Sequence, residues 1–174
     1  HQSRGYCGKE RLSEDHWSRG NGWAAFALAE LVKELPEDHP RYPIIKTMFE
    51  ELMTSCVEWQ NEHGLWHQEM TREDSFVETS GTGLILHSLG VGLEKGLLPE
   101  RAREAYHKGL KGFLTYVSLN GSVANTCQSC LCPGDGRIAD YMSRKWIRDD
   151  VHAFGPAILA FGQAFRLGIE TISG

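Results

Sequence analysis

Trp17-Ser18-Arg19-Gly20-Asn21-Gly22-Trp23 runs directly into the alanine-rich stretch Ala24-Ala25-Phe26-Ala27-Leu28-Ala29-Glu30-Leu31-Val32. Apolar residues of the second part recur at the three-and-four spacing of one helical face, at positions 24, 27, 28, 31, 32 and 35. Pro36 follows, and a proline ends a helical pattern at or before the residue that precedes it. The pattern therefore predicts a helix over about residues 24–35 that is buried along this face.

The seven residues before the predicted helix contain two indoles and one guanidinium. Gly20 and Gly22 predict a turn there, because glycine adopts backbone conformations that side chains block. Indole faces suit sugar rings, and the planar fork of arginine suits a carboxylate. Trp17, Arg19 and Trp23 are therefore candidate binding residues for an acidic sugar. The alternative is that the indoles belong to the core and that Arg19 is a surface or capping charge.

The composition limits the classes of partner. A chain of 174 residues with a formal net charge of −5 suits one domain, and its 18 Lys and Arg residues form no basic stripe, which argues against nucleic acid. Its apolar runs are far shorter than the ~20 residues of a membrane-spanning helix, and no signal peptide is visible. We therefore expect no membrane partner and favour the cytoplasm, with the periplasm as the alternative. The chain begins at His1, within a predicted loop. A leader segment that was removed or is missing therefore stays an alternative.

Three of the five cysteines, Cys127, Cys130 and Cys132, form a cluster. Three thiolates could bind zinc, but structural zinc sites usually have four ligands and the second C-x-x-C pair is missing. We therefore expect reduced thiols in a loop, with no metal and no cofactor. Zinc ligation by this cluster stays the alternative.

Four more helices are predicted from the same periodicity. They span about residues 40–60, 80–95, 99–118 and 150–168. The helix at 80–95 contains four glycines, which cost about 1 kcal/mol each relative to alanine and make sense in a helix that is packed closely on several sides. Three long connections remain, at 1–22, 62–79 and 119–150, and the last of these is expected to lack a helix of its own.

Short and long connections alternate along the chain. Short turns follow the small-residue helices at 24–35 and 80–95, whereas long loops follow the bulkier helices at 40–60 and 99–118. All the long loops must therefore open at one end of the array. This alternation predicts an all-α stack of helical hairpins, with small-residue helices inside and amphipathic helices outside.

Several single residues allow both a structural and a functional interpretation. His67 and His152 could face a site, but a hydrogen-bonded loop histidine is the commoner case. The run Glu78-Thr79-Ser80 is expected to cap the helix that follows it. Trp66 and Trp146 are equally suited to the core and to a sugar contact.

Five motifs, in their order and spacing, resemble the unsaturated glucuronyl and rhamnogalacturonyl hydrolases, most closely glycoside hydrolase family 105, with family 88 as its relative. The motifs are Trp17-Ser-Arg-Gly-Asn-Gly-Trp23, Gly64-Leu-Trp-His-Gln68, Glu78-Thr-Ser-Gly81, Asn125-Thr-Cys127, and Asp150-Val-His152 before Gly155-Pro156. The resemblance implies an (α/α)6 barrel of six helical hairpins without a metal. The chain, as one domain over 1–174, resembles somewhat under half of such a barrel, its C-terminal part.

The resemblance also implies a reaction and a set of site residues. Such enzymes hydrate the 4,5 double bond of the unsaturated galacturonic or glucuronic acid that pectin and glycosaminoglycan lyases leave at the non-reducing end of an oligosaccharide. In the family an aspartate donates the proton and activates the water, and its position falls before His1, so no catalytic residue is assigned in this chain. The residues that match the substrate subsite are His1, Trp17, Arg19 and Trp23, and the implied partner is an acidic oligosaccharide.

Without the upstream aspartate the chain alone should not catalyse the family reaction. We favour a fragment of a longer protein. The alternatives are that another chain supplies the missing half or that activity has been lost. A half barrel would also expose apolar helix faces that need covering, by the N-terminal half or by a second copy. A non-catalytic helical module that binds a partner or zinc is the alternative function.

Overall fold

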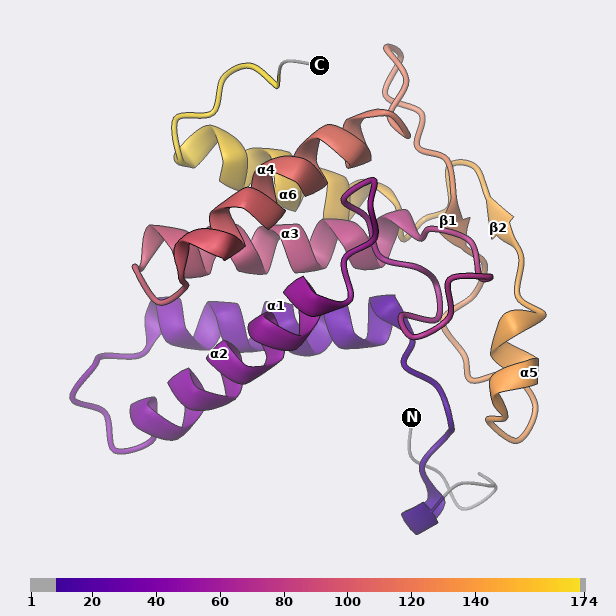
Figure 1. Ribbon diagram of the computed structural model, residues 1–174, viewed down its shortest axis with the longest axis horizontal. Coiled ribbons are helices and arrows are strands. Elements are labelled where there is room, and N and C mark those ends of the chain that lie inside the picture. The colour runs from indigo at the N-terminus through magenta and orange to yellow at the C-terminus, as the bar shows by residue number, and fades with distance from the viewer. Residues whose placement is uncertain (1–8, 173–174) are drawn as a thin grey trace.

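The computed structural model describes residues 9–172, so His1 lies outside the described part of the chain. Five long helices dominate it, which confirms the all-α prediction (Figure 1). They are α1 (Ser18–Glu34), α2 (Tyr42–Glu58), α3 (Thr79–Glu94), α4 (Glu100–Leu114) and α6 (Phe154–Arg166). The smaller elements are η1 (Lys9–Arg11), β1 (Thr126–Cys127), α5 (Ile138–Met142) and β2 (Trp146–Ile147).

Helix α3 lies at the centre of the fold. It is flanked by α1 and α6, while α2 and α4 form a second layer against this row (Figure 1). All of its residues from Thr79 to Leu93 are buried. Its glycines allow the close packing, since a Cβ added at Gly83 would lie 2.7 Å from the backbone of Pro156 on α6. The predicted inside position of a small-residue helix is therefore confirmed for α3, whereas the small-residue helix α1 keeps one side exposed.

Gly83→Ala should lower the free energy of unfolding by about 1–3 kcal/mol, because the added methyl group forces α3 and α6 apart. This cost outweighs the gain of about 1 kcal/mol in helix propensity. Gly162→Ala in α6 is the matched control, since a Cβ there meets nothing within 4 Å and should leave stability unchanged or raised. Urea unfolding followed by circular dichroism measures both, and equal stability of the two variants would contradict the packing argument.

Helix α1 begins at Ser18, six residues earlier than predicted, so Gly20 and Gly22 lie inside the helix rather than in a turn. A Cβ added at Gly22 would lie 2.9 Å from the Cβ of Leu84 on α3. Gly22 therefore lets two helices approach each other, and the predicted turn was wrong.

The buried face of α1 matches the predicted one only in part: Val32 is fully buried, and Leu28 and Leu35 are partly buried against the core. Ala25, Ala29 and Val32 are fully buried against α3, whereas Ala24 and Ala27 are exposed and Leu31 is 40% exposed. The reason is that α1 carries apolar residues on both sides, so its periodicity fits two faces. Contact with α3 selects one of them and leaves the other open.

The remaining boundaries shift by a few residues. Helix α6 begins at Phe154 rather than near Asp150, because the Asp150 carboxylate accepts a hydrogen bond from the backbone N–H of His152 at 2.9 Å and holds a turn before the helix. The third long connection is not without a helix, since it contains α5. It also contains a short antiparallel ladder that pairs Thr126 with Ile147 and Cys127 with Trp146.

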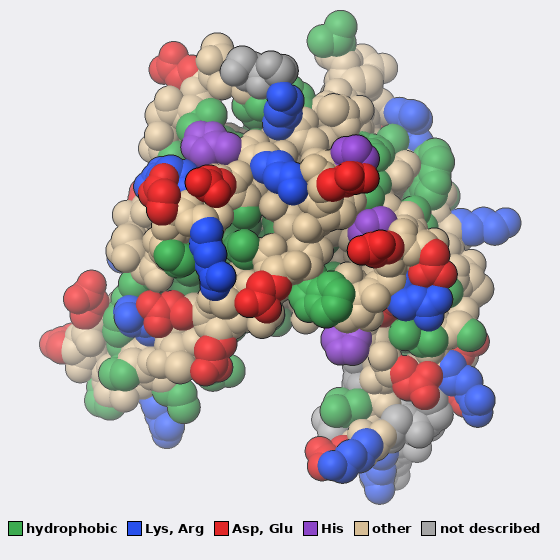
Figure 2. Space-filling view, viewed as in Figure 1, with side chains coloured by type: hydrophobic (Ala, Val, Ile, Leu, Met, Phe, Trp, Pro, Cys, Tyr) green, Lys and Arg blue, Asp and Glu red, His purple; other side chains and the backbone are tan. Residues whose placement is uncertain are grey.

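The three long connections meet at one end of the helices, as predicted. The backbone N–H of Ser18 donates to the carbonyl of Gln68 at 3.0 Å, and the Gln68 side-chain amide donates to the carbonyl of Tyr141 at 3.2 Å. These contacts join the first connection to the second and the second to the third. In the described part of the chain, no helix is both long and apolar enough to span a membrane. Acidic and basic side chains are intermixed on the face in Figure 2.

Candidate functional site

Arg19 lies at the loop end, on the first turn of α1, and is 0% exposed. One Nη1–H donates to Ser80 Oγ at 3.3 Å, and Nη2 donates to the carbonyls of Cys127, at 3.1 Å, and Ser129. The guanidinium carbon lies 4.7 Å from the centre of the Trp17 ring, a cation–π distance. Arg19 is therefore neither a surface charge nor open at a mouth, but part of a buried polar cluster.

The two tryptophans of the motif have different surroundings. Trp17 is 6% exposed and packs with Cys127 and Tyr141, so its ring belongs to the wall of the loop end. Trp23 is 48% exposed and makes an edge-to-face contact with Phe26 at 5.9 Å between ring centres. Trp23 follows Arg19 by four residues on the same helix, so the two side chains share one side of α1. Of the two indoles, Trp23 is the one that offers an open face.

Glu78 lies at the centre of the buried cluster, a role that was not predicted from the sequence. Its carboxylate is fully buried and accepts from the backbone N–H groups of Ser80 at 3.1 Å, Gly81 at 2.6 Å and Cys127 at 2.9 Å. The predicted cap of α3 is present, but the carboxylate of Glu78 is the acceptor rather than a Ser or Thr hydroxyl. An acidic residue directly before an apolar helix was the available signal.

Ser80 connects the two buried charges. Its hydroxyl accepts from Arg19 and donates to Glu78 Oε1 at 2.6 Å. The network therefore joins α1, the N-terminus of α3 and strand β1. Since each charge is desolvated, each depends on the other groups of the network for stabilisation.

Asp150 and His152 form a second polar pair beside this network. Asp150 Oδ1 lies 2.5 Å from His152 Nδ1 and also accepts the backbone N–H of His152. Burial alone would raise the pKa of Asp150, but the hydrogen bonds from His152, aided by the charges of His152 and Arg19, leave that pKa below its usual value. His67 is likewise hydrogen-bonded within its loop, with Nδ1 lying 2.5 Å from the carbonyl of Ser75.

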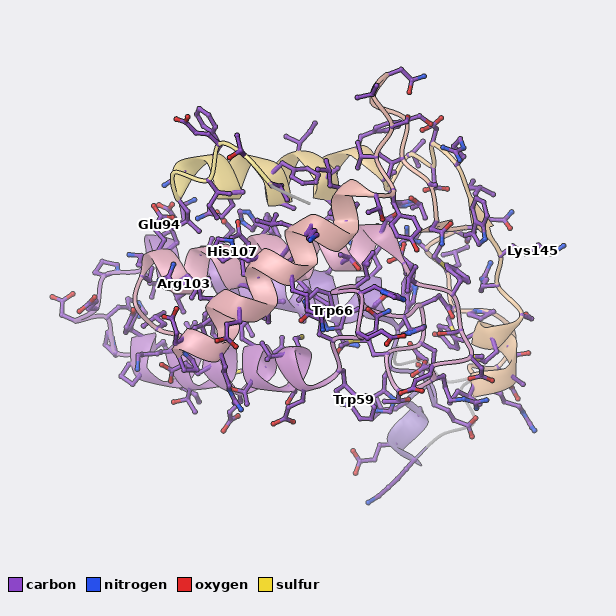
Figure 3. All side chains as sticks on the ribbon, turned by 45° about the horizontal axis from the view of Figure 1, so that its top comes forward. Trp59, Trp66, Glu94, Arg103, His107 and Lys145 are labelled. Atoms are coloured by element: carbon purple, nitrogen blue, oxygen red, sulfur yellow. The ribbon has the colours of Figure 1, made fainter. Side chains whose placement is uncertain are left out.

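Of the other two tryptophans considered in the sequence, one is buried and one is exposed. Trp66 is fully buried and donates from Nε1 to the carbonyl of Cys56 at 2.6 Å, and Figure 3 shows it inside the loop end. Trp146 on β2 is 45% exposed. Its neighbour Lys145 points away from the body of the molecule in Figure 3. Trp66 therefore serves the core.

The cysteine cluster combines one buried and two accessible thiols. Cys127 is buried, Cys130 is exposed and Cys132 is intermediate. Burial, reinforced by the charge of Glu78, raises the pKa of the Cys127 thiol to about 11. Among residues 9–172 no three His, Cys, Asp or Glu side chains are grouped closely enough to hold a metal ion.

We expect no stoichiometric zinc to stay bound to Cys127, Cys130 and Cys132 after dialysis. The buried thiol resists the deprotonation that zinc ligation requires, and a fourth ligand at the usual spacing is missing. Metal analysis of the purified protein tests this. One zinc per chain that survives dialysis would contradict the prediction.

Iodoacetamide at pH 8 should alkylate Cys130 at least about tenfold faster than Cys127, because the thiolate is the reactive species and burial suppresses it at Cys127. Tandem mass spectrometry of the peptide that contains the cluster measures both rates. Unfolding in urea is the control and should make the rates similar. Equal rates in the native protein would show that the loop does not shield Cys127.

A sequence model described as Glycosyl Hydrolase Family 88 matches residues 3–167. The chain belongs to this family. It is 31% identical over 110 residues to the unsaturated 3S-rhamnoglycuronyl hydrolase of Alteromonas sp. (strain LOR), a match that covers 62% of this chain and 27% of that protein. It is 33% identical over 81 residues to the unsaturated rhamnogalacturonyl hydrolase YesR of Bacillus subtilis (strain 168), covering 47% of this chain and 24% of the relative.

The fold matches that of a solved family 105 glycoside hydrolase from C. acetobutylicum ATCC 824 with a TM-score of 0.83 and 24% identity. That match covers 94% of this family 88 chain and 49% of the solved one. The resemblance stated from the motifs is thus confirmed, as is the expectation of part of an (α/α)6 barrel. The chain spans about half of the solved barrel, and its matches cover about a quarter of the two curated relatives.

Proposed function

We propose that this family 88 chain forms one domain, over 1–174, of a glycoside hydrolase that hydrates the 4,5 double bond of an unsaturated uronic acid at the non-reducing end of an oligosaccharide. The observation that carries the proposal is the family match over residues 3–167, together with relatives whose names are those of unsaturated rhamnoglycuronyl and rhamnogalacturonyl hydrolases. The partner is an acidic oligosaccharide, and we expect neither nucleic acid nor membrane as a partner.

Arg19 and Trp23 are the described residues that we assign to the substrate. In the described part of the chain, the buried Nε of Arg19 has no hydrogen-bond acceptor. A buried donor without an acceptor costs about 1–3 kcal/mol. A substrate carboxylate oxygen would recover that cost on our proposal that the carbonyls of Cys127 and Ser129, which cover the guanidinium here, move aside when substrate binds. The half-exposed face of Trp23, one turn away, would stack on the sugar ring. The Trp17 ring contacts the guanidinium at 4.7 Å. His1 remains a proposed substrate-binding residue, because it matches the family motif.

The proton donor belongs to a segment outside the chain. The family places its catalytic aspartate before His1, and Asp15 does not match that position. We therefore expect residues 1–174 alone to show no turnover, and a longer protein that includes the upstream segment to be active. Loss of ultraviolet absorbance of the conjugated double bond measures this. A longer protein without activity on any unsaturated disaccharide would contradict the proposal.

The longer protein should prefer unsaturated galacturonyl-rhamnose to unsaturated chondroitin disaccharide. The expectation rests on the Gly20-Asn21-Gly22 variant of the motif, which resembles the rhamnogalacturonan-type branch. The names of both relatives, rhamnoglycuronyl and rhamnogalacturonyl hydrolase, share the prefix rhamno-. Steady-state rates on the two substrates test it. A clear preference for the sulfated disaccharide would reverse the assignment.

A further inference from the structure

We propose that the chain has a second, non-catalytic binding site for an anionic sugar residue, in a cavity between the end of α4 and the connection from α2 to α3. The cavity has a volume of 440 Å³, within the range of about 300–1,000 Å³ that is typical of small-molecule sites. Its lining residues fall between positions 62 and 116, and they include neither Arg19 nor Trp23. The class of saccharide rests on the proposed function, whereas the cavity and its charge do not.

The two walls of the cavity are fixed to each other. Gln60 Nε2 donates to the carbonyl of Gly64, at 2.9 Å, and to that of Ala105 on α4, at 2.8 Å. Gly112 allows the close approach of the walls, since a Cβ there would collide with the carbonyl oxygen of His63. The cavity is therefore preformed, which lowers the conformational entropy that binding would cost.

Two ammonium groups line the cavity without a carboxylate partner. Lys108 and Lys111 are exposed and lie three residues apart on α4, so their side chains are neighbours on the helix surface. In the described part of the chain, the Lys108 ammonium donates to the carbonyl of Asn61, at 2.8 Å, and Lys111 forms no hydrogen bond or ion pair. Glu62 also lines the cavity, but its carboxylate pairs with His63 Nε2 at 3.6 Å. The two lysines therefore leave positive charge available to an anionic group.

The rest of the lining suits a sugar ring better than a bare anion. Tyr116 is half-buried and offers an aromatic ring, and Leu65 adds apolar surface next to it. The Thr115 hydroxyl donates to the carbonyl of Gly112 at 2.7 Å and keeps lone pairs that can accept from a sugar hydroxyl. A bare anion would use the lysines alone, so the lining as a whole favours an anionic sugar.

A second hollow borders the same two lysines. Its volume is 360 Å³, and Lys108 and Lys111 line it together with His107, Leu110 and Ile169. A saccharide of more than one residue can therefore cross the lysine pair and occupy both hollows. We expect a trisaccharide to bind more tightly than a single galacturonate.

Nuclear magnetic resonance of the isotope-labelled chain tests the site with saturated trigalacturonate, which lacks the double bond and cannot be turned over. The ligand should shift the amide signals of Leu65, Lys111 and Thr115. Lys111→Glu should raise the dissociation constant at least about tenfold, because it replaces an attractive charge by a repulsive one, and Lys111→Arg should stay close to wild type. Lys95→Glu is the matched control, since Lys95 is exposed at the other end of α3, and it should leave the dissociation constant unchanged.

Three further ligands identify the group that the lysines bind. A saturated sulfated disaccharide offers a sulfate ester in place of the carboxylate, maltotriose is a neutral sugar, and inorganic sulfate is a bare anion. Maltotriose and inorganic sulfate should each bind at least about tenfold more weakly than trigalacturonate or the sulfated disaccharide. Tighter binding of trigalacturonate would identify a uronate site and tighter binding of the sulfated sugar a sulfate-ester site, and both results support the proposal.

Four results would overturn it. Absence of any shift at about 10 mM of either anionic saccharide would show that the cavity binds no anionic sugar. Unchanged binding in Lys111→Glu, or loss of binding in Trp23→Ala, would place the ligand elsewhere. Equal affinity for inorganic sulfate would leave only a bare-anion site. Circular dichroism of each variant controls for folding. Inactivity of the longer protein would contradict the hydrolase proposal alone, because none of these measurements uses turnover.

Discussion

Replacing Glu78 with alanine should lower the free energy of unfolding by about 3–5 kcal/mol, the cost of removing one partner from a buried charged network. The carboxylate is fully buried, and its loss leaves the backbone N–H groups of Ser80, Gly81 and Cys127 without their acceptor. It also removes the anion that the buried Arg19 reaches through Ser80. Since these groups belong to α1, α3 and β1, the loss affects all three elements.

Urea unfolding of the purified chain, followed by circular dichroism, measures this effect. Glu104→Ala is the matched control, because Glu104 is exposed on α4, and it should change stability by less than about 0.5 kcal/mol. Glu78→Gln should fall between the two, since the amide keeps one acceptor oxygen but loses the charge. If Glu78→Ala were as stable as Glu104→Ala, water would be replacing the carboxylate and the network would not hold the loop end together.

Arg19→Lys should lower kcat/KM of the longer, active protein by about 10- to 150-fold, which corresponds to about 1.5–3 kcal/mol of transition-state stabilisation. A carboxylate conjugated to the reacting double bond has to be held in place and in plane before a proton reaches the neighbouring carbon. The planar fork of arginine does both, whereas an ammonium group keeps the charge and loses the fork.

The structure adds a cost in stability to this substitution. Arg19 is fully buried and donates to Ser80, Cys127 and Ser129, so Arg19→Lys should also lower the free energy of unfolding, by about 1–3 kcal/mol. Gly83→Ala separates the two effects, because it destabilises the packing of α3 on α6 without changing a side chain of the network. Its kcat/KM should stay at the wild-type level. Wild-type kcat/KM in Arg19→Lys would limit Arg19 to a structural role.

The sequence by itself determined the helical order of this protein. Spacing of apolar residues identified five helices, and the four glycines of α3 indicated a helix packed on several sides. The alternation of short and long connections required the long loops to meet at one end, because a chain that runs up and down must return at alternate ends. These are properties of local periodicity and connectivity, which need no knowledge of neighbours. The motif around Arg19 likewise indicated the family, later confirmed over residues 3–167.

Only the tertiary structure decided which side of each element is buried. Residues 24, 27 and 31 of α1 fit a buried stripe as well as residues 25, 29 and 32 do, and contact with α3 selected the second set. Arg19 is a buried residue because carbonyls from 127 and 129, over a hundred positions away in the chain, fold over it. Glu78 accepts the N–H groups of Ser80 and Gly81 as a local helix cap, but the third N–H comes from Cys127, 49 positions away. Burial and hydrogen bonding depend on residues distant in sequence, and the local spacing of apolar residues does not predict which distant residues will be in contact.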